Sequence, residues 1–111
     1  MKKIPLLLSL ASLLLLAPAV VRASALDDWN ANCKGCHGPD GAGHTKAGRT
    51  KGVKDLTDAA YQAKFTDAQI TTQIKQGSKT EDGKEKMKGF ADKFSDAQVA
   101  DLVGLVRSFK K

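Results

Sequence analysis

The sequence has few of the residues that usually hold a small domain together. Its 111 residues include only two cysteines, three prolines and six aromatic side chains. Two cysteines allow no more than one disulfide bond. So few aromatic residues predict a thin hydrophobic core, and small domains of this kind usually need a disulfide, a metal or a buried cofactor. The two cysteines are therefore the first residues to examine for such support.

The sequence also lacks the features of a nucleic-acid-binding protein. Its formal net charge of +6 includes Lys2, Lys3 and Arg22, which all belong to the first 25 residues. Without them, 15 basic and 12 acidic residues leave a net charge of +3, and no basic cluster is interleaved with aromatic residues. We therefore expect no nucleic-acid partner.

Residues 1–25 have the pattern of an export signal. Two lysines at the start precede residues 4–16, which are largely apolar, and residues 23–25 read Ala-Ser-Ala, an A-x-A cleavage site. We therefore predict that residues 1–25 are a Sec-type signal peptide. Residues 26–111 are then a single exported domain, and the periplasm is its expected location.

An uncleaved membrane anchor is the alternative, because residues 4–21 form a run of 18 residues without a charge. Pro5, Pro18 and the small residues before the first charge favour cleavage instead. No cysteine lies at the cleavage point, so a lipid-anchored start is unsupported. After cleavage we expect a monomer that does not insert into the membrane.

Within residues 26–111 the pattern is that of an all-α domain. A short helix is expected from Leu26 to about Cys36, and another over residues 57–63. Residues 38–52 contain five glycines and Pro39, which predicts a loop with little regular structure. No segment has the features of a strand.

Two further helices have clear start signals. Thr66-Asp67-Ala68-Gln69 and Ser95-Asp96-Ala97-Gln98 both match the capping box, in which a hydroxyl and a Gln three residues later satisfy each other's backbone N–H groups. The first helix is expected to stop at Gly77. The second carries an apolar stripe at helical spacing: Val99, Leu102, Val103, Val106 and Phe109. We interpret the similar segments as a shared start signal rather than a duplication.

The motif that carries chemistry is Cys33-Lys34-Gly35-Cys36-His37, the Cys-x-x-Cys-His attachment sequence of c-type haem. On a helix, residues i and i+3 share a face, so both thiols can reach the two vinyl groups of one haem. His37 is then the expected proximal ligand of the haem iron. A redox disulfide or a zinc site is the alternative, but the first lacks its βαβ pattern and the second lacks ligands.

The sixth position of a haem iron separates an electron carrier from an enzyme. Met87 is the candidate ligand, because it lies 50 residues after His37 between two lysines and away from apolar neighbours. A thioether is a soft ligand that favours reduced iron. His44 is the rival ligand, although seven residues of loop are a short tether to the opposite face of a haem. A surface or gap-filling methionine is the remaining alternative for Met87.

With these residues in hand, the chain resembles the class I c-type cytochromes, especially the small monohaem periplasmic proteins of bacteria. The resemblance covers residues 26–111 and depends on three features: the motif CKGCHGPDG, the single downstream Met87 followed by Gly89 and Phe90, and the closing helix. It implies about four short helices around one covalent haem c, with the first and last helices packed across each other. It also implies His/Met ligation of the iron.

Several positions depart from the family pattern. Lys88 stands where relatives often have a proline after the ligand methionine, so we expect a more mobile loop there. Pro39 is the only proline after residue 25, so no acceptor for the His37 imidazole proton can be named. Gly104 replaces a common aromatic residue of the last helix and suggests a close helix contact. Arg49 and Lys51 are candidates to meet the haem propionates, with solvent exposure as the alternative.

The function implied by the resemblance is that of a soluble single-electron carrier and not an enzyme. Its partners would be redox proteins, an electron donor and an acceptor. The alternative is a haem enzyme or gas-binding haem protein with a displaceable sixth ligand, for which His44 is the only imidazole left over. A zinc-bound or disulfide-stapled binding module is the third hypothesis.

Overall fold

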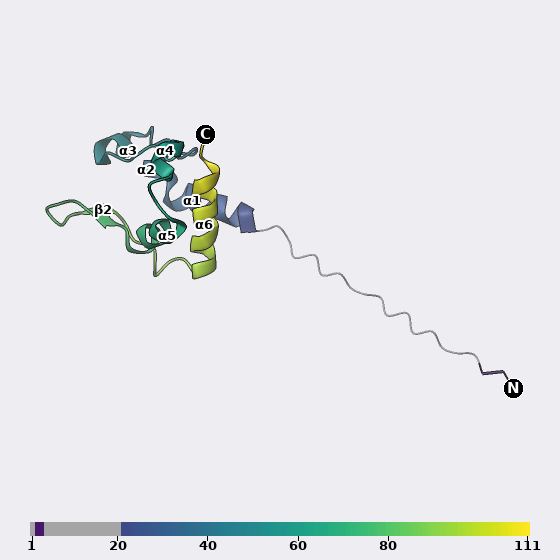
Figure 1. Ribbon diagram of the computed structural model, residues 1–111. Helices are drawn as coiled ribbons and strands as arrows, with labels where there is room; N and C mark the ends of the chain where they lie inside the picture. The colour runs from purple at the N-terminus through teal and green to yellow at the C-terminus, as the bar shows by residue number, and fades with distance from the viewer. Residues whose placement is uncertain (1, 4–20) are drawn as a thin grey trace.

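The computed structural model describes residues 2–3 and 21–111, so most of the predicted signal peptide lies outside the described residues. The described part contains six helices and a two-stranded hairpin (Figure 1). In chain order they are α1 (Val21–Asn32), α2 (Lys34–His37), α3 (Lys46–Lys51), α4 (Ala59–Gln62), α5 (Asp67–Gln76), β1 (Ser78–Lys79), β2 (Glu85–Met87) and α6 (Asp96–Ser108). The predicted all-α class is confirmed. No helix of the described residues has the length and apolar character needed to cross a membrane.

The first and last helices pack against each other, as the resemblance implied, and α1 passes behind α6 in Figure 1. The ring of Trp29 on α1 lies 4.9 Å from the ring of Phe109 at the end of α6. Trp29 is 3% exposed, and its indole N–H donates to the carbonyl of Gly38 at 2.9 Å. The core around it consists of Ile74, Phe90, Phe94, Val99, Leu102, Val103 and Val106.

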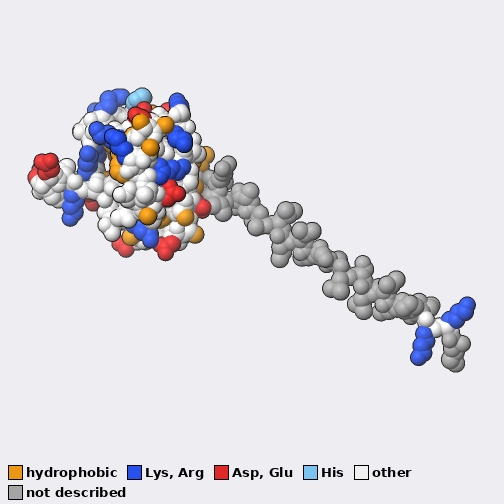
Figure 2. Space-filling view, viewed as in Figure 1, with side chains coloured by type: hydrophobic (Ala, Val, Ile, Leu, Met, Phe, Trp, Pro, Cys, Tyr) orange, Lys and Arg blue, Asp and Glu red, His pale blue; other side chains and the backbone are white. Residues whose placement is uncertain are grey.

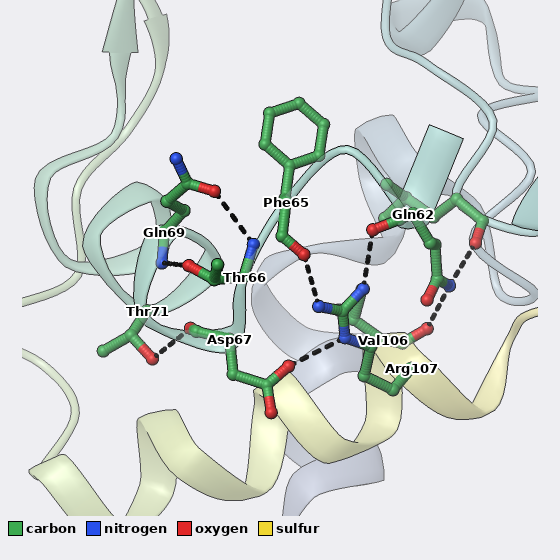
Figure 3. Close-up of polar contacts among 9 residues, drawn as sticks. Gln62, Phe65, Thr66, Asp67, Gln69, Thr71, Val106 and Arg107 are labelled. Carbon is green, nitrogen blue, oxygen red and sulfur yellow. Dashed lines mark hydrogen bonds and ion pairs between the residues drawn. The ribbon is translucent and has the colours of Figure 1, made fainter. Parts of the chain in front are cut away.

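Both capping boxes are present with both of their hydrogen bonds. At the start of α5, the backbone N–H of Gln69 donates to the hydroxyl of Thr66 at 3.1 Å (Figure 3). The Gln69 amide oxygen accepts from the Thr66 backbone N–H at 2.8 Å. Ser95 and Gln98 repeat the arrangement at the start of α6. The predicted end of α5 at Gly77 is also confirmed.

The N-terminal helix is interrupted where the sequence predicted one continuous element. α1 ends at Asn32, and the chain resumes helical geometry in α2 after Cys33. Helical hydrogen bonding spans the interruption, because the Cys33 N–H donates to the Trp29 carbonyl at 2.8 Å. The two cysteines therefore lie on consecutive turns of nearly helical backbone.

Three expectations about the remaining chain are wrong. The glycine-rich segment contains α3, because the Thr45 hydroxyl caps it by accepting from the Gly48 N–H at 2.8 Å. β1 and β2 form an antiparallel hairpin, whose short strands leave no alternating pattern in the sequence. Gly104 makes no close helix contact, because a Cβ built there meets nothing within 4 Å.

Candidate functional site

A cavity of about 540 Å³ opens between α1–α2, α5, α6 and the hairpin. Much of its wall is apolar, formed by Trp29, Val53, Leu56, Phe65, Ile70, Ile74, Phe90, Leu102 and Val106. All four residues that the sequence predicted as the site line this one cavity: Cys33, Cys36, His37 and Met87. Residues separated by 50 positions are therefore brought together by the fold.

The two cysteines lie at the end of the cavity formed by α1 and α2. Both are half-buried and not joined in a disulfide. Burial raises the pKa of the Cys33 thiol to about 11, and the nearby Asp28 carboxylate adds to the rise. Burial therefore favours the neutral form of the Cys33 thiol at this wall of the cavity.

His37 stands at the end of α2 beside the ring of Trp29, at 5.5 Å between ring centroids. Burial lowers the pKa of its imidazole, which favours the neutral form that coordinates metals. Its Nδ1 atom is buried and has no hydrogen-bond partner among the described residues. No acceptor for the His37 imidazole proton is therefore found, in keeping with the missing family proline.

Met87 ends β2 and is held at the cavity by close backbone contacts. It pairs with Ser78 of β1. Gly77, with a φ of +68°, lies so near that a Cβ there would overlap the Met87 carbonyl oxygen. The next residues dock on α5, because the Phe90 N–H donates to the Ile74 carbonyl at 2.9 Å. These contacts fix the backbone of Met87 although no proline follows it.

The rival ligand His44 lies elsewhere. It is exposed, and the described residues that line the cavity do not include it. Its charge instead acts on Asp55, whose carboxyl pKa is lowered mainly by hydrogen bonds from Thr57 and to a lesser degree by His44. The fold therefore does not bring His44 together with the other predicted site residues.

Of the two basic residues expected to contact an anionic group at the cavity, Lys51 and Arg49, only Lys51 lines it. Lys51 lines the cavity and donates to the Lys86 carbonyl of the hairpin at 3.1 Å. Arg49 does not line it in the described chain. Figure 2 shows basic side chains spread over the visible face with acidic ones among them. The visible face therefore offers no continuous patch of one charge.

Two glutamines of the cavity wall were missed by the sequence reasoning. Gln62 is 4% exposed, and its amide donates to the carbonyls of Leu56 at 2.6 Å and Val106 at 2.8 Å (Figure 3). Gln73 of α5 reaches the sulfur of Met87. Gln73 follows Gln69 by four residues and lies next to the apolar residues of the same helix. This spacing could have predicted that Gln73 faces the cavity.

The zinc hypothesis finds no support in the arrangement. Across the described ranges, no group of three or more His, Cys, Asp or Glu side chains is placed to hold a metal ion. Cys33, Cys36 and His37 line the cavity together with the Met87 thioether and the Glu85 carboxylate, and a thioether is not among the usual ligands of zinc.

Known families and solved structures include relatives of this chain. The family model described as Cytochrome C oxidase, cbb3-type, subunit III matches residues 23–106. Among solved structures, the chain is similar to the KustC0563 c-type cytochrome, at 37% sequence identity and a TM-score of 0.68, over 78% of this chain and 98% of that chain. It is also similar to a Kustc0563 mutant, at 36% identity and a TM-score of 0.65 with the same coverage. No curated protein matches the chain.

Proposed function

This chain belongs to the c-type cytochromes, in the family described as Cytochrome C oxidase, cbb3-type, subunit III, and from that premise we propose that it is a soluble single-electron carrier. It would use one covalent haem c with His37 and Met87 as axial ligands of the iron. The single observation that carries the proposal is the placement of Cys33, Cys36, His37 and Met87 on the walls of one largely apolar cavity.

The residues present fit a haem. A cavity of about 540 Å³ is within the range of small-ligand and cofactor sites, and its apolar walls suit a flat hydrophobic ring. Cys33 and Cys36 would form the two thioether bonds. His37, neutral because its burial lowers its pKa, and the soft thioether of Met87 are suitable iron ligands.

When bound, the haem supplies the reversible one-electron chemistry of its iron. The chain would hold it, exclude water from it and set its potential. The buried apolar residues Ile74, Phe90 and Leu102 of the wall would favour the less charged, reduced state of the haem iron. A methionine ligand also favours reduced iron, so we expect a high potential.

A haem stain on a denaturing gel and visible spectra test this proposal. Protein produced in a host that attaches c-type haem should keep its haem on a denaturing gel, and a Cys33→Ser/Cys36→Ser variant should lose it. The oxidised protein should show the far-red charge-transfer band of a methionine–iron bond. Met87→Ala should abolish this band, and the matched control His44→Ala should keep it.

Carbon monoxide separates the carrier from the alternative enzyme or gas-binding protein. With Met87 bound, the reduced wild type should resist carbon monoxide, whereas Met87→Ala should bind it readily. Ready binding by the wild type, or a charge-transfer band that survives Met87→Ala, would contradict the assigned ligand.

The location and assembly belong to the same proposal. The cleaved signal over residues 1–25, export to the periplasm, a monomeric state and redox-protein partners are inferred from the sequence pattern and the family. α1 begins at Val21 and the family match begins at residue 23, so both include the predicted cleavage site. N-terminal sequencing of the exported protein should give Leu26 as the first residue, and any other start would revise the boundary.

A further inference from the structure

We propose that Gln73 is a positioning residue for Met87: its side-chain amide donates to the thioether sulfur, orients it and raises the reduction potential. Nε2 of Gln73 and Sδ of Met87 are 3.6 Å apart. This inference rests on the proposed function, since it concerns Met87 as an iron ligand. It adds a residue that the motif and the family match do not identify.

Gln73 lies on the face of α5 that lines the cavity. Gln69, Ile70, Gln73 and Ile74 all present their side chains to the cavity from α5. The side-chain amide oxygen of Gln69 accepts from the Thr66 backbone N–H in the capping box. Among the contacts of the described residues, the Gln73 amide has Met87 as its hydrogen-bond partner. Gln73 is itself exposed, so its amide reaches solvent on one side and the Met87 sulfur on the other.

A sulfur that accepts one hydrogen bond remains available as a ligand. A thioether has two lone pairs and is a weak acceptor, so an amide on one lone pair leaves the second free for a metal. Methionine has three rotatable bonds and adopts many side-chain conformations. The hairpin pairing with Ser78 and the contact with Gly77 fix only the Met87 backbone. The Gln73 amide supplies the missing restraint on the side chain.

The same contact has an electrostatic consequence. The amide N–H places the positive end of a dipole against the sulfur. Positive potential near the iron stabilises the less charged reduced state, and hydrogen bonds to ligand atoms are an established means of tuning a metal. Removal of the Gln73 amide should therefore lower the potential and loosen Met87.

The test uses the haem-loaded full protein with three variants. Gln73→Leu and Gln73→Ala remove the amide with different side-chain volumes. Gln76→Leu is the matched control, because Gln76 lies on the same helix and is exposed like Gln73, but does not line the cavity. The readouts are the potential, the far-red charge-transfer band, and the affinity of the oxidised protein for imidazole as a competitor of Met87.

Both Gln73 variants should lower the potential, shift the band and tighten imidazole binding roughly two- to ten-fold, the loss of one ordinary hydrogen bond. Gln76→Leu should match the wild type. If Met87→Ala abolishes the band while both Gln73 variants match Gln76→Leu, the inference is overturned and the ligand assignment stands. If Met87→Ala leaves the band intact, Met87 is not the iron ligand. The proposed function and this inference, which depends on it, are then both contradicted.

Discussion

The guanidinium of Arg107 and the carboxylate of Asp67 join α6 to the start of α5, with Nε donating to Oδ1 at 2.8 Å (Figure 3). The same guanidinium donates to the backbone carbonyls of Gln62 at 2.8 Å and Phe65 at 2.6 Å. One side chain therefore holds the segment between α4 and α5 against the last helix.

Arg107→Met should therefore lower the free energy of unfolding by roughly 1.5–4 kcal/mol, because three hydrogen bonds are lost and the apolar stem is kept. Asp67→Asn should change it by less than about 1 kcal/mol, since the carboxylate side of the ion pair is largely exposed. Denaturant unfolding of the two variants measures both. Equal losses would show that the ion pair, and not the backbone contacts, is the stabilising part.

Trp29→Phe should destabilise the protein by roughly 1–3 kcal/mol, because the Gly38 carbonyl then loses its buried donor. Leu26→Ala on the same helix is the control, since Leu26 is 44% exposed and its truncation should have little effect. Thermal unfolding of the haem-loaded proteins provides the comparison. A Trp29→Phe variant as stable as the control would mean that water replaces the indole at this carbonyl.

Gly77→Ala should displace Met87 and abolish the charge-transfer band, because the new Cβ overlaps the Met87 carbonyl oxygen. Gly83→Ala is the matched control: Gly83 also has a positive φ, of +85°, but nothing lies within 4 Å of its built Cβ. The control should show only the backbone penalty, about 1–2 kcal/mol, and keep the band. Loss of the band in both variants would attribute the effect to hairpin strain rather than to the contact.

Asp55→Asn should reduce the pH dependence of stability in acid. The Thr57 side chain and backbone N–H donate to the Asp55 carboxylate, which lowers the folded-state pKa below the ordinary aspartate value of about 3.9. Such a group stabilises the fold above its unfolded pKa, and the stabilisation disappears as the pH falls through the folded value. The free energies of unfolding of wild type and variant, measured at several pH values, should therefore converge below this range. A constant difference between them at all pH values would contradict the lowered pKa of Asp55.

The parts of this fold that local sequence determines were predictable. A capping box consists of groups three residues apart, so the starts of α5 and α6 follow from Thr66, Gln69, Ser95 and Gln98 alone. The Cys-x-x-Cys-His motif is also local in sequence, and it predicted three residues of the cavity: Cys33, Cys36 and His37. Met87 was found because it was the only methionine available downstream of His37.

The parts that depend on distant contacts were not predictable. The Arg107 contacts span 40 to 45 residues, and no local pattern signals them. α3 was hidden by Gly48 and by the glycines on either side of the helix, although Gly48 is required there: a Cβ would overlap the Cys36 carbonyl oxygen. The role proposed for Gln73 depends on its contact with Met87, which is 14 residues away on another element. The strands of the hairpin are too short to show a period.

The tip of the β1–β2 hairpin is a suitable place to attach the protein to an electrode or a dye. Its closure is local, because the Thr80 N–H donates to the Lys84 carbonyl at 2.8 Å and the space around Gly83 is open. The contacts that hold Met87 lie at the other end, at Gly77 and α5. A Glu81→Cys substitution in the same turn, at an exposed position without a positive φ, would therefore give a covalent link to an electrode or a dye without moving the cavity.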